Sequence, residues 1–145
     1  RGKRRVFQPA HWNLYFNELM GHCEDGYIVY LDDDDIFNVP YALSMIEKHI
    51  DNNDQLLFWR VMFPHSIVPN DRAWGKAPIP ANISTIGFSF HTKYVDYAQW
   101  EGYSYGDFRV ADRLYKTIPN KVWIDQILTK VNRSKAGGHG RRDDL

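Results

Sequence analysis

Four consecutive aspartates, at residues 32–35, are the part of this 145-residue chain whose type and spacing most directly suggest chemistry. Carboxylates this close repel one another, and a divalent cation would offset the repulsion. Mg²⁺ and Mn²⁺ prefer oxygen ligands and keep coordination positions open for phosphate oxygens. An EF-hand is excluded, because its loop needs alternating ligands, a central glycine and a late glutamate. The run therefore indicates either a metal and phosphate site or a solvated acidic turn.

The five residues before the aspartates, 27–31, are apolar or aromatic. A short apolar run without polar alternation is typical of a strand buried on both faces. In open α/β sheets, ligands bind just beyond the carboxyl ends of such strands. Ile36 and Phe37 follow the aspartates, so the carboxylates lie between two apolar anchors. These neighbours favour the metal site over the solvated turn.

Residues 30–35 (YLDDDD) resemble the metal-binding Asp-x-Asp element of GT-A glycosyltransferases, especially the family 2 group. The resemblance implies transfer of a sugar from a UDP- or GDP-sugar donor to a glycan or other hydroxyl acceptor, with inversion. It implies that Asp32 and Asp33 lie in the donor site, Asp32 near the ribose. It also implies that Asp34 binds Mn²⁺ or Mg²⁺ on the diphosphate. Because Asp35 extends the run, the register stays open by one residue.

The resemblance also implies roles for residues further along the chain. Gly87, in residues 86–89 (IGFS), matches a glycine segment that lets the backbone approach a sugar closely. Asp107 matches the carboxylate that acts as base on the acceptor hydroxyl, although the family often has Glu-Asp where this chain has Gly106 and Asp107. An aspartate at a helix start is otherwise an ordinary cap. Asp112, one helical turn further on, is the fallback base.

A histidine in the glycine-rich segment 137–140 is the remaining candidate ligand. The resemblance implies that His139 binds the metal, since many GT-A enzymes have a ligating histidine downstream of the catalytic acid. Imidazole suits Mn²⁺ better than Mg²⁺. The alternative is that residues 132–145 form a flexible tail.

Apolar periodicity predicts the first elements around the aspartates. Residues 9–20 and 39–50 show helical spacing, and Asn38 is the expected N-cap of the second helix. Residues 56–63 are dense in β-forming types and predict a strand. Strand, helix and strand in this order predict a βαβ unit with a parallel strand pair and hence an α/β class.

The second half of the chain begins with an expected loop. Four prolines within residues 64–81 exclude a long regular element there, and Trp74 on this loop is either a platform for a sugar or a packing anchor. Residues 83–90 alternate like a strand, a helix opens at Asp107, and short strands are predicted later. Those strands cover residues 121–124 and 126–131.

The resemblance implies a GT-A-like mixed sheet flanked by helices that lacks the N-terminal nucleotide-binding strands. The expectation is therefore that residues 1–145 form a single domain, the C-terminal part of a GT-A catalytic domain. Two alternatives remain open at this point. One is a nucleotidyltransferase of related fold, and the other is a non-catalytic module that binds nucleic acid or carbohydrate.

The composition of the chain helps to choose among these classes of protein. Hydrophobic residues make up 43% of the chain and aromatic residues 15%, which is typical of a folded globular domain. Eighteen acidic and eighteen basic residues balance, so a general nucleic-acid binder is not expected. The single cysteine, Cys23, cannot form an internal disulfide, which favours the cytoplasm. No run approaches the ~20 apolar residues of a transmembrane helix. The basic ends leave peripheral contact with a membrane surface open.

Overall fold

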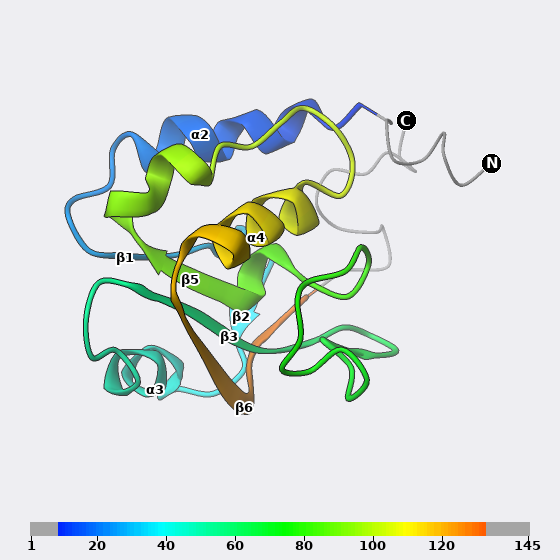
Figure 1. Cartoon of the computed structure of the whole chain (residues 1–145). Coiled ribbons are helices and arrows are strands. Elements are labelled where there is room, and N and C mark those ends of the chain that lie inside the picture. The colour runs from blue at the N-terminus through cyan, green and yellow to red at the C-terminus, as the bar shows by residue number, and fades with distance from the viewer. Residues whose placement is uncertain (1–8, 133–145) are drawn as a thin grey trace.

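The central strand is β3 (Gln55–Met62), where six of eight residues are buried. It belongs to a computed structural model that describes residues 9–132, with helices on both faces of a mixed sheet (Figure 1). The expected mixed α/β class is confirmed. The other elements are η1 (His11–Asn13), α2 (Leu14–Met20), β1 (Tyr27–Val29), β2 (Ile36–Phe37), α3 (Ala42–Lys48), β4 (Ile67–Val68), η2 (Thr85–Gly87), β5 (Phe88–His91), η3 (Thr92–Tyr97), α4 (Gly106–Thr117) and β6 (Asn120–Lys130).

The strands follow the order β1-β5-β3-β6-β2, and the short β4 pairs with β3. Among the strands between residues 9 and 132, only β3 and β6 pair in parallel; the other pairs are antiparallel. The first strand and β3 run parallel, as the βαβ pattern predicts, but they do not pair directly, because β5 lies between them and is antiparallel to both. After the long connection that follows β3, the chain returns as β5 and lies between β1 and β3.

The first strand also differs from its prediction. Ile28 and Tyr30 are buried, but Tyr27 and Val29 are only partly buried and Leu31 is exposed. β1 stands at one end of the strand order within residues 9–132. The expected burial on both faces is found in β3 instead, because β3 has hydrogen-bonded strands on both sides and helices above and below.

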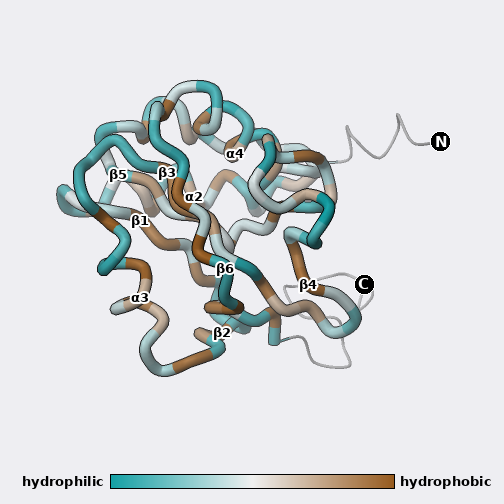
Figure 2. Tube along the Cα trace, turned by 60° about the horizontal axis from the view of Figure 1, so that its bottom comes forward, coloured by the Kyte–Doolittle hydropathy of each residue, from teal (hydrophilic) through white to brown (hydrophobic). Residues whose placement is uncertain are grey.

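The two faces of β3 belong to separate apolar clusters. Leu56 and Phe58 pack toward α2 and α4, while Leu57, Trp59 and Val61 pack toward α3. Figure 1 shows α2 and α4 on one side of the sheet and α3 on the other. In Figure 2, hydrophobic colour follows the strands through the middle of the molecule. The result is a three-layer arrangement in which alternate residues of one strand hold both helical layers.

The last strand is continuous where two strands are predicted. In the β3–β6 register, Ile124 pairs with Trp59 and Ile127 pairs with Arg60, so residues 125–126 form a bulge. The Asp125 carboxylate accepts a hydrogen bond from Arg60 Nε at 2.8 Å. The polar pair 125–126 therefore bends the strand without ending it.

Both early helices are shorter than predicted. The segment 9–20 contains a 3-10 turn, η1, followed by α2, and α3 begins only at Ala42. Asn38 is not the cap of α3, because its side chain donates to the Ile127 carbonyl at 3.1 Å and ties the end of β2 to β6. α4 is found where predicted and begins one residue before Asp107. Within residues 9–132, no helix is long and apolar enough to cross a membrane.

The loop after β3 is largely irregular, as predicted, apart from β4. Trp74 is partly buried, with its ring 5.1 Å from that of Trp123 and the Arg60 guanidinium 4.4 Å above it. Arg60 also pairs with Asp71 of the same loop at 2.8 Å. These contacts favour the packing-anchor interpretation of Trp74 over a sugar platform.

Gly87 provides a test of this packing. A Cβ atom at Gly87 would lie 2.8 Å from Val61 Cγ2 and 3.5 Å from the Trp59 carbonyl oxygen. We expect Gly87→Ala to lower the free energy of unfolding by about 1–3 kcal/mol, because overpacking a close contact forces neighbours to shift. Urea denaturation measures this change. Gly102→Ala is the control, since its nearest neighbours would be 3.6 Å or more away. Equal stability of the two variants would contradict the packing role.

Candidate metal and base site

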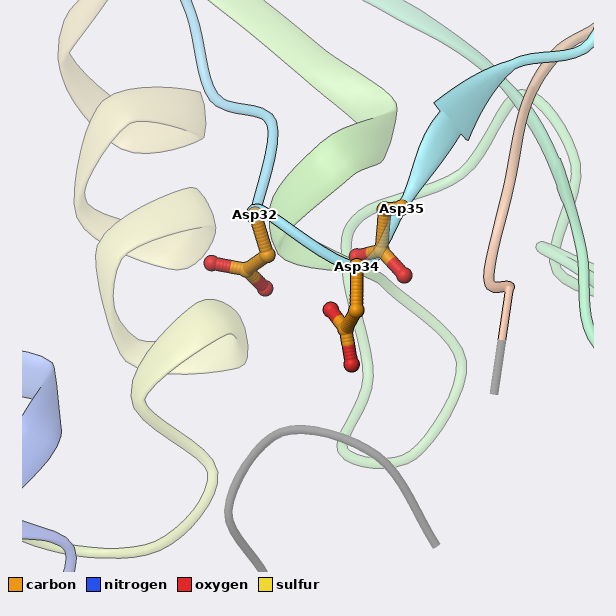
Figure 3. A group of neighbouring side chains, drawn as sticks. All are labelled: Asp32, Asp34 and Asp35. Carbon is orange, nitrogen blue, oxygen red and sulfur yellow. The ribbon is translucent and has the colours of Figure 1, made fainter. Parts of the chain in front are cut away.

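The aspartate run forms a tight turn between β1 and β2. The Asp35 amide donates to the Asp32 carbonyl at 3.0 Å, which closes the turn over residues 33–34. This turn brings Asp32, Asp34 and Asp35 together, with one carboxylate oxygen of each within 4.8 Å of the others (Figure 3). Such a set of oxygen ligands suits a hard divalent cation.

The structure assigns different surroundings to the four aspartates. Asp34 lies in the cluster, as the metal prediction requires, and Asp35 joins it. Asp33 is exposed and lines a neighbouring hollow beside α2, which it shares with Asp32. Asp35 also accepts a hydrogen bond from the Asn132 amide at 3.3 Å, so the end of β6 reaches the site. Asp34 and Asp35 are therefore both candidate ligands.

The three carboxylates open into a hollow of about 140 Å³ that also includes Asp107. Asp107 lies in the first turn of α4, far from the aspartate run in sequence. Two predicted functional positions therefore meet in one cavity. The remaining walls of this acidic hollow come from Phe63, Ser84, Ile86 and Val131.

Asp107 differs electrostatically from the acidic cluster. Burial raises the pKa of its carboxyl to about 6, because the charged form loses hydration. Hydrogen bonds from the backbone amides of Phe108, at 2.7 Å, and of Asp107 itself oppose the rise only in part. Desolvation therefore sets the direction of the pKa shift of Asp107.

The start of α4 is fixed by a close contact with η1. A Cβ atom on Gly106 would lie 2.6 Å from Asn13 Nδ2 and 2.9 Å from a ring carbon of Trp100. The Asn13 amide is itself held, because it donates to the carbonyls of Tyr103 at 2.8 Å and Glu101 at 3.2 Å. A glutamate at position 106 would collide with these groups. The Glu-Asp pattern of the resemblance is therefore incompatible with the packing at this position.

The strand that leads into the aspartates is fixed from the same side. The Tyr30 ring packs edge-on against Phe16 and Trp100, with centroids 5.0 and 5.6 Å away. Trp100 Nε1 donates to the Tyr30 hydroxyl at 3.3 Å, and burial raises the pKa of that hydroxyl. Asn17 binds both the amide and the carbonyl of Trp100, at 2.6 and 2.8 Å. One tryptophan therefore links α2, the end of β1 and the segment before α4.

Two other predicted positions lie elsewhere, and a third is not described. Asp112 pairs with Lys116 at 2.8 Å and is not among the residues that line the acidic hollow. Gly87 is buried against Val61 and also does not line that hollow, whereas its neighbours Ser84 and Ile86 do. His139 and most of the predicted 132–145 tail lie outside the described residues.

Sequence reasoning held Asp35 only as an alternative to Asp34, and it missed most of the walls of the hollow. The i to i+3 spacing of Asp32 and Asp35 was a signal that Asp35 joins the cluster, since a tight turn brings such positions together. Nothing in the local sequence indicated that Phe63 and Val131 would line this hollow. They become neighbours through the parallel β3–β6 pairing, in which the Val131 amide donates to the Met62 carbonyl at 2.9 Å.

Comparison with known proteins adds no family assignment. No protein-family model matches the chain, and no curated protein matches it. What this site does must therefore be inferred from its own residues.

The raised pKa of Asp107 predicts a pH-dependent stability. The unfolded chain releases this proton at lower pH than the folded protein, so ionisation destabilises the fold as pH rises from about 4 to 6. We expect Asp107→Asn to raise the unfolding free energy by about 1–3 kcal/mol above about pH 7, and by little near pH 4. Urea denaturation across this range, without metal, measures the difference.

Asp112→Asn is the control, because it lies on the same helix and outside the hollow. We expect it to show no corresponding gain at neutral pH. A carboxyl ¹³C titration of the metal-free protein should place the Asp107 midpoint near 6. A midpoint below about 4.5, closer to the value of an unperturbed aspartate, would contradict the burial argument.

Proposed function

We propose that this chain carries the metal-binding and base residues of a metal-dependent GT-A-type glycosyltransferase, similar to family 2. The observation that carries the proposal is the convergence of Asp107 with Asp32, Asp34 and Asp35 on one hollow. A partly buried carboxylate with a raised pKa next to a cluster of metal-ligating carboxylates suits a reaction with an anionic leaving group and a hydroxyl nucleophile.

The chemical step assigned to Asp107 is proton removal. The acceptor hydroxyl oxygen attacks the anomeric carbon of the donor, the bond from that carbon to the diphosphate oxygen breaks, and Asp107 takes the hydroxyl proton. A single displacement of this kind inverts the anomeric centre. With a pKa of about 6, Asp107 is charged at neutral pH and is a stronger base than an ordinary aspartate.

The acidic cluster is assigned to the donor end of the reaction. Asp34 and Asp35, with Asp32, would hold Mn²⁺ or Mg²⁺, and the oxygen-only set within 4.8 Å fits such an ion. The bound ion would supply positive charge that stabilises the leaving diphosphate. The donor is a UDP- or GDP-sugar, with Asp32 and the exposed Asp33 on its nucleoside side.

Metal-dependent nucleotide binding tests the cluster. We expect Mn²⁺ together with UDP or GDP to raise the melting temperature of the parent protein. The Asp34→Ala and Asp35→Ala variants should not show this rise. Each substitution removes one of the three clustered carboxylates. A thermal shift series with UDP, GDP and CTP, each with and without Mn²⁺, provides the measurement.

Asp96→Ala is the matched control, since Asp96 is an exposed aspartate on η3 outside the acidic hollow. It should keep the full metal-dependent shift. If the cluster variants bind Mn²⁺ and nucleotide as well as the parent protein does, the metal assignment is wrong. A preference for CTP with release of pyrophosphate would favour nucleotidyl transfer.

The rate of sugar transfer tests the role of Asp107 as the base. We expect Asp107→Asn to lower the rate of sugar transfer by about 10²–10⁴, the usual contribution of general base catalysis, with little change in donor affinity. The amide keeps the size of the side chain and can still accept the Phe108 hydrogen bond. The assay is transfer to a matched acceptor, together with calorimetric titration of the donor.

Asp112→Asn should be mild, because Asp112 pairs with Lys116 on another part of α4. Near-normal turnover in Asp107→Asn would remove Asp107 from the mechanism. A severe loss in Asp112→Asn would move the base role to that residue.

A further inference from the structure

Trp12 is the one exposed tryptophan among five. Its exposed fraction is 63%, whereas Trp59 and Trp100 are buried and Trp74 packs against Trp123. Within residues 9–132, no other ring packs against the indole of Trp12. A large exposed aromatic surface beside a polar cavity is a common feature of ligand sites.

The backbone around Trp12 is held in place before any ligand arrives. The Ala10 amide donates to the Gly102 carbonyl at 2.8 Å, and Pro9 forms a bridge with Tyr103. On the other side of Trp12, the Asn13 side chain donates to the Tyr103 carbonyl at 2.8 Å. The indole therefore extends from a turn that is fixed on both sides.

Trp12 lines two hollows of about 260 Å³ each, and they lead to different aspartates. The first is shared with Asp32 and Asp33. The second, which we call the Trp12–Asp107 hollow, is lined by Pro9, Ala10, Trp12, Asn13, Ser104, Tyr105, Gly106 and Asp107. Asp107 thus borders both the acidic hollow and the Trp12–Asp107 hollow.

Tyr105 adds a second aromatic wall under backbone strain. Its φ of 60° and ψ of 31° are left-handed, a conformation that glycine adopts freely and that a tyrosine rarely does. Strained residues of this kind cluster at functional sites. Because a glycine here would relieve the strain, the tyrosine side chain itself is the feature that needs an explanation, and it lines the Trp12–Asp107 hollow.

We propose that the acceptor is itself a sugar, and that its pyranose ring stacks on Trp12 with one hydroxyl at Asp107. The inference depends on the proposed function for the acceptor role of the sugar and for the role of Asp107 as base, whereas sugar binding at Trp12 is independent of it. One face of a pyranose ring carries C–H bonds and suits an aromatic plane, while its hydroxyl edge suits carboxylate and backbone groups. A hollow of 260 Å³ lies just below the usual range of small-molecule sites, about 300–1,000 Å³, which fits one ring.

The test measures sugar binding without a donor. Methyl glycosides of glucose, galactose and N-acetylglucosamine are titrated into ¹⁵N-labelled protein, and the indole N–H signals are followed by NMR. Trp12→Phe assigns the Trp12 signal. At least one glycoside should shift that signal saturably, while sorbitol, uridine and a serine peptide should not. A shift with uridine or the peptide alone would overturn the sugar assignment in favour of a nucleobase or protein ligand.

Substitutions show whether the two aromatic residues form the site. We expect Trp12→Ala to weaken binding of the same glycoside by about tenfold or more, as truncation of a central aromatic contact commonly does. Tyr105→Gly should also weaken it, yet keep or raise the melting temperature because the left-handed strain is relieved. Tyr41→Ala is the control and should bind normally, because Tyr41 is an exposed aromatic residue just before α3 and lines neither hollow.

Unchanged glycoside binding in Trp12→Ala would overturn the proposal, and so would the absence of any glycoside shift. Failure here is distinct from failure of the proposed function. If Asp34→Ala abolishes Mn²⁺–nucleotide binding but no sugar reaches Trp12, the sugar acceptor is wrong and the transferase proposal stands. If sugars bind Trp12 but no nucleotide binds with metal, the transferase proposal is wrong and a carbohydrate-binding site remains.

Discussion

The close approach of Gly106 to Asn13 and Trp100 is the contact on which the candidate site depends. It brings the start of α4 against η1 with no room for a side chain at position 106. Asn13 fills the space and uses its amide to hold the carbonyls of the segment before α4. The next residue along the helix, Asp107, consequently lies in the acidic hollow. The packing among Gly106, Asn13 and Trp100, to which we assign no catalytic role, thus sets the position of the candidate base.

The site handles its negative charges in two different ways. The aspartates of the turn are only partly buried or exposed, so water or a bound cation can meet their charge. Asp107 is less hydrated, and burial raises its pKa toward neutrality. Carboxylates with such different environments can divide the tasks of binding a cation and moving a proton. The site has both environments only because the fold brings the aspartate turn and the start of α4 to one hollow.

Local patterns predicted the type and place of most elements, although not all of their bounds, and did not predict which strands lie side by side. The β-rich run at 56–63, the helix opening near Asp107 and the acidic turn after an apolar strand all follow from short-range sequence, and all are found. The position of β5 between β1 and β3 does not, because strand order depends on long connections. The local sequence predicts that Asn38 caps a helix, but its side-chain amide instead donates to the Ile127 carbonyl of β6. The walls of the hollow depend on the same long-range pairings.

The two sides of the acidic hollow are held by different interactions. On the sheet side, the buried Ile86 carbonyl accepts hydrogen bonds from Trp59 Nε1 at 2.9 Å and Thr129 Oγ1 at 2.7 Å, so η2 is tied to β3 and β6 at once. On the α2 side, asparagine side chains bind loop carbonyls in place of a strand ladder. The Ile86 contacts and the asparagine contacts thus fix opposite walls of one site by different means, so the hollows around Asp107 are formed before a ligand binds.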